Sequence, residues 1–216
     1  MTAMAAVQVP AGTSTLSGDL DVPAGATGLV AFAHGSGSSR HSPRNREVAT
    51  RLRQRGLATL LVDLLTPDEE SADRRTGELR FDIGLLAERV VAVLEWARSD
   101  DRTGALPGGA FGASTGGGAA LVAAAMRPDL ICAVVSRGGR PDLAGPSLPA
   151  VRAPTLLIVG SADHVVRELN EHALDRLSAT KELAVVPGAG HLFEEPGALR
   201  QVADLAGAWF ARWLAV

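Results

Sequence analysis

The segment 112–116, Gly-Ala-Ser-Thr-Gly, places Ser114 between a predicted strand and a predicted helix. A serine at such a sharp turn is held in a strained backbone and is exposed above the sheet, where it can act as a nucleophile. The flanking glycines let the strand and the helix approach closely, and the helix N-terminus directs free N–H groups toward developing negative charge. A glycine-rich turn with an incidental serine would give the same short pattern. The position after a central strand favours the nucleophile.

A nucleophilic serine needs a base, and the base needs an acid that orients it. Asp163 directly follows the predicted strand 155–160, and His191 lies in a glycine-rich loop after the predicted strand 183–187. The chain order Ser, Asp, His is one in which such triads occur on parallel sheets. We therefore predict a Ser114–His191–Asp163 triad. Asp142 is the alternative acid, because it follows the neighbouring strand 131–136.

Two backbone N–H groups are candidates for stabilising the oxyanion that forms when a serine attacks a carbonyl. One belongs to Thr115, directly after the proposed nucleophile, and the other to Ser36, in the loop that follows the predicted strand 28–33. His34 begins that loop, so we expect it to brace the loop or to border the substrate.

Two arginines are candidates for binding substrate. Arg40 leaves the same loop as Ser36, and Arg137 directly follows the strand 131–136. Both are expected near the carboxyl edge of the sheet, where a guanidinium group could bind a carboxylate or a phosphate. The alternative for Arg137 is an ion pair with Asp142 or another loop carboxylate that only holds this edge together.

From Gly28 onward, short apolar runs alternate with segments of helical period, which predicts an α/β fold with a parallel sheet. Several strands are continuously apolar, as expected where helices cover both faces of the sheet. Before Gly28, two alternating segments predict an antiparallel hairpin at the sheet edge. The six predicted central strands are 28–33, 58–64, 108–113, 131–136, 155–160 and 183–187.

Helix signals follow most of these strands. Ser42 and Pro43 predict a helix start, and Gly56 predicts the end of the same helix. A last helix is predicted to begin near Pro196. The polar segment 66–80 is expected to be a solvated loop that could border the site. Two apolar stripes mark buried helix faces: Ile83, Leu86, Val90, Leu94 and Ala97, then Leu199, Val202, Leu205, Trp209 and Trp213.

The composition is typical of an ordinary soluble, globular protein. The 216 residues suit one domain over residues 1–216, and a net charge of −3 with scattered basic residues gives no indication of nucleic-acid or membrane binding. The only cysteine, Cys132, lies in a predicted strand, where we expect a buried, inert thiol. No secretory signal or membrane span is evident, so we expect a cytoplasmic monomer or homodimer. No metal-ligand spacing occurs, and we predict no metal.

Two non-hydrolytic alternatives remain. The run GSGSSR, followed by Asp63 at the end of the next strand, is weakly similar to a dinucleotide-binding fingerprint. Arg40 stands where the third glycine should be, however, and the predicted helix begins late. The second alternative is a binding protein without catalysis. The complete triad and oxyanion loop argue against it.

The chain resembles the dienelactone hydrolase-like branch of the α/β-hydrolase superfamily, from about Gly28 to the C-terminus. The segments that carry the likeness are FAHGSGSSR, FGASTGG, LLIVGSAD and GAGHLFEE, in this order. The resemblance implies an eight-stranded, mostly parallel sheet, no cofactor and hydrolysis of esters or lactones, with Ser114, Asp163 and His191 as nucleophile, acid and base. Dienelactone hydrolases have a cysteine where this chain has Ser114, so dienelactone itself is not carried over as the substrate.

The segment between the strands 131–136 and 155–160 is too short for a cap domain, which predicts an open site for small, soluble acyl substrates. Thioester hydrolysis and acyl transfer would use the same triad and remain open alternatives to ester hydrolysis.

Overall fold

The computed structural model describes residues 4–215, which form an eight-stranded sheet in the order β1-β2-β4-β3-β5-β6-β7-β8. β1 and β2 form the predicted antiparallel hairpin at one edge, β2 also runs antiparallel to β4, and the remaining pairs are parallel. The predicted mostly parallel sheet is confirmed. Its strands are β1 (Ala5–Ala11), β2 (Ser14–Asp21), β3 (Gly28–Ala33), β4 (Leu57–Val62), β5 (Gly108–Ala113), β6 (Ile131–Arg137), β7 (Thr155–Gly160) and β8 (Lys181–Val186).

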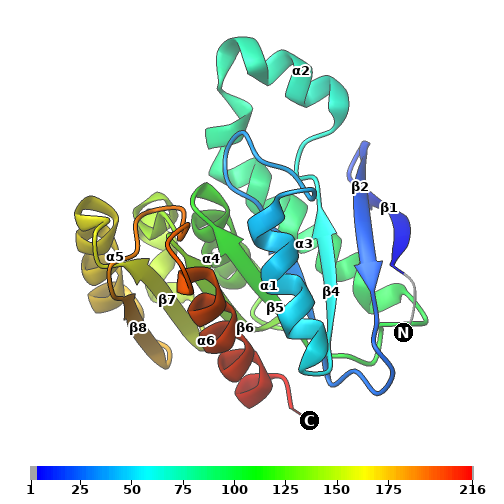
Figure 1. The fold of residues 1–216 in the computed structure, drawn as a ribbon. Coiled ribbons are helices and arrows are strands. Elements are labelled where there is room, and N and C mark those ends of the chain that lie inside the picture. Colours follow the sequence, from blue (N-terminus) through cyan, green and yellow to red (C-terminus); the bar gives the residue numbers. More distant parts are fainter. Residues whose placement is uncertain (1–3, 216) are drawn as a thin grey trace.

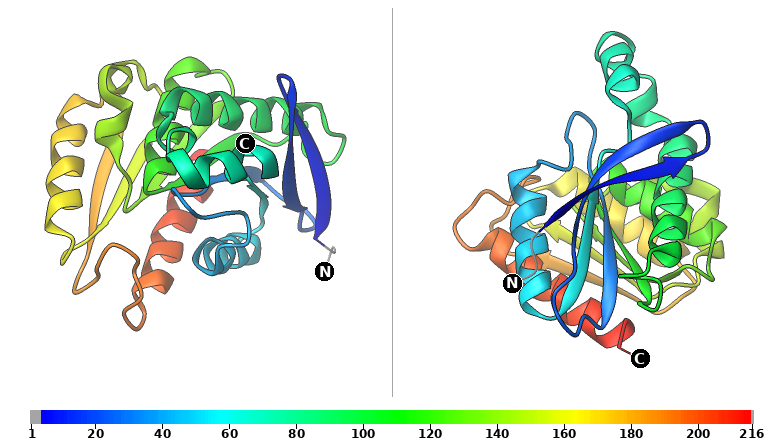
Figure 2. Two further views of the ribbon diagram at one scale, coloured as in Figure 1. Left: turned by 90° about the horizontal axis from the view of Figure 1, so that it is seen from above. Right: turned by 90° about the vertical axis from the view of Figure 1, so that its right-hand side faces the viewer.

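Helices cover both faces of this sheet (Figures 1 and 2). α1 (Pro43–Gln54) and α6 (Ala198–Trp213) pack together on one face. α3 (Ile83–Ser99), α4 (Thr115–Met126) and α5 (His164–Arg176) lie on the other. β3, β4 and β7 are buried at every position, as continuous apolar strands between two helical layers should be. The sheet therefore has a hydrophobic core on each side.

The predicted helix signals mostly hold. The Ser42 hydroxyl accepts a hydrogen bond from the Asn45 N–H at 3.3 Å at the start of α1, and Gly56 follows that helix with a φ of 79°. On α3 the predicted stripe is buried except Ile83, which is half-buried. On α6, Val202 and Trp209 of the predicted stripe are buried, and Leu199, Leu205 and Trp213 are partly buried against the same core. The helix also buries small side chains that lie outside the predicted stripe. Its buried residues are Ala198, Val202, Ala203, Ala206, Gly207, Trp209 and Phe210.

The prediction of a loop over 66–80 is wrong. This segment contains α2 (Pro67–Thr76) and a single 3₁₀ turn, η1 (Leu79–Phe81), and it stands out beyond the carboxyl edge of the sheet (Figure 1). Thr66 and Glu69 form a capping box at its start, and Gly77, with a φ of 71°, ends it. The Thr-Pro-Asp-Glu sequence at 66–69 carries the capping signal, which outweighs the polar composition of the segment.

Cys132 is exposed, so the prediction of a buried thiol is also wrong. Gly108 pairs with Ile131 and Gly109 pairs with Ala133, which leaves Cys132 as the extra residue of a β-bulge. A bulge breaks the inward and outward alternation of a strand, so the side chain at this position faces solvent.

A second 3₁₀-helical segment, η2 (Pro141–Ala150), occupies the connection between β6 and β7, and no cap domain is inserted there. Among residues 4–215, no helix is both long and apolar enough to cross a membrane.

Candidate active site

Ser114 occupies the turn between β5 and α4 with a φ of 52° and a ψ of −122°. Apart from glycines, only Ser114 and Phe193 have a positive φ among residues 4–215. Such backbone conformations cost about 1–3 kcal/mol and concentrate at functional sites. Both residues lie at the carboxyl edge of the sheet, one at the predicted nucleophile and the other two residues after the predicted base.

Close backbone contacts hold the turn at Ser114 in place. A Cβ atom on Gly112 would lie 2.3 Å from the carbonyl oxygen of Gly116, and one on Gly116 would lie 2.2 Å from the carbonyl oxygen of Ala33. Both distances are far below van der Waals contact, so only glycine fits at either position. The two glycines of the G-x-S-x-G pattern thus bring β5, α4 and the end of β3 together beneath the serine.

Asp163 and His191 form the predicted acid–base pair. His191 Nδ1 donates a hydrogen bond to Asp163 Oδ2 at 2.7 Å, which leaves Nε2 as the nitrogen available to a nucleophile. Asp163 is the N-cap residue of α5, but its side chain makes no capping bond there. The alternative acid, Asp142, instead receives two hydrogen bonds from Arg140, at 2.8 and 2.7 Å.

The loop that carries His191 is fixed by hydrogen bonds to its neighbours. The N–H of Gly188 donates to Ser161 Oγ at 2.7 Å, and the N–H of Gly190 donates to Glu195 Oε1 at 2.9 Å. A Cβ atom on Gly160, at the end of β7, would lie 2.2 Å from the carbonyl oxygen of Ala189. The loops that carry the acid and the base are therefore packed directly on each other.

Ser114 and His191 line one cavity of about 230 Å³, together with the loop residues Gly35 and Ser36. Within the described residues, no hydrogen bond joins the two side chains. In enzymes without substrate, such catalytic contacts are often loose and tighten when substrate binds. The arrangement brings the three predicted triad residues to one edge of the sheet.

The two predicted oxyanion donors come from neighbouring segments, but only one of the two N–H groups already has an acceptor. The N–H of Ser36 donates to Thr115 Oγ1 at 2.9 Å, and no acceptor is found for the N–H of Thr115 among the described residues. A Cβ atom on Gly35 would lie 3.0 Å from Ser114 Cβ, so the loop can approach the serine only because residue 35 is glycine. The Thr115 hydroxyl is thus the acceptor of the Ser36 N–H in this structure.

His34 braces the oxyanion loop. Its Nδ1 donates to the carbonyl oxygen of Gly35 at 2.9 Å, and its Nε2 accepts from the N–H of Leu64 at 3.0 Å. Burial lowers the pKa of His34, although the Gly35 hydrogen bond and nearby carboxylates oppose this shift. A second proton would have to lie on Nε2, against the Leu64 N–H. His34 is therefore a neutral structural residue and does not contact the Ser114 cavity.

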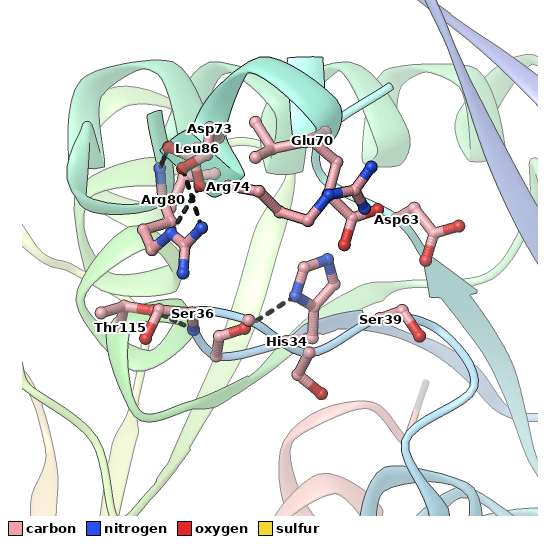
Figure 3. Close-up of a pocket in the computed structure, with 14 residues that line it drawn as sticks. His34, Ser36, Ser39, Asp63, Glu70, Asp73, Arg74, Arg80, Leu86 and Thr115 are labelled. Carbon is pink, nitrogen blue, oxygen red and sulfur yellow. Dashed lines mark hydrogen bonds and ion pairs between the residues drawn. The ribbon is translucent and has the colours of Figure 1, made fainter. Parts of the chain in front are cut away.

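A second cavity, of about 170 Å³, lies between the oxyanion loop and α2 (Figure 3). It is lined by charged side chains of both signs, and Arg80 is held there by the buried carboxylate of Asp73 with an Nε–Oδ2 distance of 2.5 Å. Gly35 and Ser36 line this cavity as well as the Ser114 cavity. The segment 66–80 therefore borders the site, as anticipated, but as a helix.

The two candidate arginines have different environments. Arg40 forms ion pairs with Asp63 and, at 3.5 Å, with Asp19, and it does not line the Ser114 cavity. Arg137 lines that cavity and has no acidic partner among the described residues, so the predicted alternative of an Arg137–Asp142 pair is wrong. Its Nη2 donates to Asn45 Oδ1 at 3.3 Å.

Asn45 is a site residue that sequence reasoning missed. It is buried on the same face of α1 as Val48, Ala49 and Leu52. A lone amide within an apolar stripe is the signal that could have identified it, because buried polar groups need partners. Phe193, whose ring centroid lies 5.9 Å from the Arg137 guanidinium carbon, carries no such signal in the sequence.

No group of three or more histidine, cysteine, aspartate or glutamate side chains within residues 4–215 is arranged to hold a metal ion. The candidate site brings together a serine, a histidine–carboxylate pair and backbone donors, the groups that acyl transfer requires.

The chain is similar to proteins of a known family. The model of the dienelactone hydrolase family matches residues 23–212. The chain belongs to the dienelactone hydrolase family. A dienelactone hydrolase from Anabaena variabilis is 60% identical, with a TM-score of 0.96 over 98% of both chains. The predicted relationship is therefore confirmed.

More distant structures share the fold. An α/β serine hydrolase without a lid, from Xanthomonas campestris, is 23% identical with a TM-score of 0.79. The match covers 100% of this chain and 97% of that one. Two curated relatives from strains of Mycobacterium tuberculosis are 59% identical over 204 residues and are provisionally named phosphoribosyl transferases. The match covers 94% of this chain but only 45% of the length of these relatives.

We predict that Gly116→Ala destabilises the protein by about 3 kcal/mol or more. The new Cβ would collide with the backbone carbonyl oxygen of Ala33, which cannot move without distorting the end of β3. Chemical denaturation monitored by circular dichroism measures this. Gly84→Ala in α3 is the matched control, since its Cβ would lie 3.4 Å from the nearest heavy atom, an ordinary contact. Equal stability of the two variants would contradict the packing described for the turn.

The lowered pKa of His34 predicts a pH-dependent stability. Below about pH 6.5 the unfolded chain binds a proton at this residue that the folded chain resists, so the free energy of unfolding should fall as the pH falls. In His34→Gln this part of the pH dependence should be absent, whatever the variant's absolute stability. Denaturation series between about pH 5 and 8 give the two slopes, and parallel curves would show that His34 titrates normally.

Proposed function

We propose that the chain hydrolyses carboxylic esters or lactones through a covalent acyl-enzyme on Ser114. The observation that supports this most directly is the 2.7 Å hydrogen bond between His191 and Asp163 in a site that also presents Ser114 on a strained turn. A neutral histidine oriented by a carboxylate is what a serine hydroxyl needs to become a nucleophile.

In the first step, Ser114 Oγ attacks the substrate carbonyl carbon and His191 Nε2 accepts the hydroxyl proton. Asp163 stabilises the resulting imidazolium through its bond to Nδ1. The carbonyl oxygen becomes an oxyanion, which the N–H groups of Thr115 and Ser36 stabilise. Substrate would displace the Thr115 hydroxyl from the Ser36 N–H, and the N-terminus of α4 adds its positive end of the helix dipole.

In the second step, the tetrahedral intermediate expels the alkoxide, which takes the proton from His191. A water molecule then attacks the acyl-enzyme while His191 again accepts a proton, and the acid product leaves as Ser114 regains its hydrogen. A lactone follows the same sequence, except that its alcohol remains attached to the acyl group. Every proton transfer in this cycle passes through His191.

The dimensions of the site favour small substrates. The cavity at Ser114 measures about 230 Å³ and no cap domain covers it. Any transferase activity of the two longer relatives concerns proteins of which this chain matches 45%, so it does not weigh against an acyl site here. Matched esters and thioesters of one acyl group would define the preferred leaving group.

Ser114→Ala should lower kcat for a short p-nitrophenyl ester by roughly 10⁴–10⁶-fold, because the nucleophile is lost while the fold is kept. Steady-state kinetics measure this, with circular dichroism to confirm folding. Cys132→Ser is the matched control for a second candidate nucleophile and should retain full activity. A folded Ser114→Ala variant with near-normal turnover would refute the assignment.

Replacing the acid separates the two aspartates that sequence reasoning left open. Asp163→Asn should reduce kcat by roughly 10⁴-fold, because His191 loses the acceptor that fixes its tautomer. Asp142→Asn should change kcat by less than a few-fold, since Asp142 pairs with Arg140. The reverse ranking of the two variants would transfer the role of the acid to Asp142.

A further inference from the structure

Arg137, the last residue of β6, is buried, and no carboxylate within residues 4–215 pairs with it. The residue is 7% exposed, and its Nε and Nη1 atoms have no hydrogen-bond partner among the described residues. Its guanidinium group contacts the Asn45 amide oxygen and the Phe193 ring. Arg140, three residues later, shows the contrast, since it makes two hydrogen bonds to Asp142.

Keeping this cation in place is energetically unfavourable. Burial lowers the pKa of Arg137 to about 10, and repulsion from Arg44 adds to the shift. The group still carries its charge at neutral pH, so the folded protein holds a desolvated guanidinium with unused donors. Buried charges are ordinarily paired, and an unpaired one in a cleft indicates a ligand that supplies the missing charge.

The surroundings of Arg137 point to the same conclusion. Arg137 lines the cavity that contains Ser114 and His191, and Arg44 lines it as well. No aspartate or glutamate contributes to the described lining of this cavity. Arg44 forms an ion pair with Glu194 at 3.2 Å. Because 66% of the glutamate side chain is exposed, solvent screens this interaction and makes it weak.

We propose that Arg137, with Arg44 beside it, forms an anion subsite next to Ser114, and that the preferred substrate is an ester or lactone bearing a carboxylate or phosphate group. The proposal rests on the proposed function of Ser114. The substrate anion would accept hydrogen bonds from the free guanidinium N–H groups while the ester carbonyl lies at the serine. Arg137 then determines specificity and takes no part in bond making.

The kinetic test compares p-nitrophenyl hemisuccinate with its neutral methyl ester, and a phosphonate analogue of the hemisuccinate distinguishes carboxylate from phosphate preference. Arg137→Gln should lower kcat/KM for the anionic esters by roughly tenfold to a hundredfold, mainly through KM, and leave the neutral ester within about twofold. Arg140→Gln is the matched control, because its side chain is paired outside the cavity. Equal losses on charged and neutral esters, or no loss on either, would overturn the proposal.

A binding measurement keeps the proposal testable if the protein hydrolyses none of these esters, an outcome that would refute the proposed function alone. In Ser114→Ala, monomethyl succinate should raise the Tm more than dimethyl succinate does, and the double variant with Arg137→Gln should lose this difference. Arg137→Gln itself should not lower the Tm of the free protein, because it removes a buried unpaired charge. Equal Tm shifts from the two succinate esters would refute the anion subsite.

Discussion

The backbone at Ser114 is the constraint on which the rest of the site depends. A positive φ at a non-glycine residue is unfavourable, and here it is maintained by packing of glycine backbone between β5, α4 and the end of β3. The same packing brings the oxyanion loop to within contact of the serine through Gly35 and directs the first N–H groups of α4 toward it. The positions of the nucleophile, the oxyanion donors and the N-terminus of α4 thus all depend on the backbone of this one turn.

The sequence predicts those parts of the fold that follow from local patterns. Apolar runs gave the central strands, and the polar residues at their carboxyl ends gave Ser114, Asp163 and His191, since parallel strands bring such residues to one edge. Asp163 and His191 are 28 residues apart in the chain, yet their hydrogen bond follows from the pairing of β7 with β8. The order of motifs along the chain therefore contained most of the candidate site.

The features that were missed depend on tertiary contacts or on competition between local signals. The exposure of Cys132 results from a bulge that depends on the register of β5 against β6. Asp142 pairs with Arg140 and not with Arg137, and side-chain packing decides between the two. In α2 the capping sequence at Thr66 and Glu69 competes with a polar composition that is typical of a loop, and the capping signal prevails. Burial of a charge cannot be read from one strand alone.

Stability and function oppose each other at this edge of the sheet. Two strained residues, Ser114 and Phe193, and one unpaired buried cation, Arg137, lie close together where the strands end. Each is unfavourable for folding, and the surrounding core of buried apolar residues on both faces of the sheet tolerates them. The function of such a protein depends on the residues of its site more than on the fold that carries them.

The central claim is that Ser114 is the residue that becomes covalently acylated. Treatment of the wild-type protein with a fluorophosphonate probe, followed by proteolysis and mass spectrometry of the labelled peptide, tests it most directly. The account predicts one label per chain, located on Ser114 and absent when Asp163 or His191 is replaced. A label on any other residue, or a folded protein that takes up none, would contradict it.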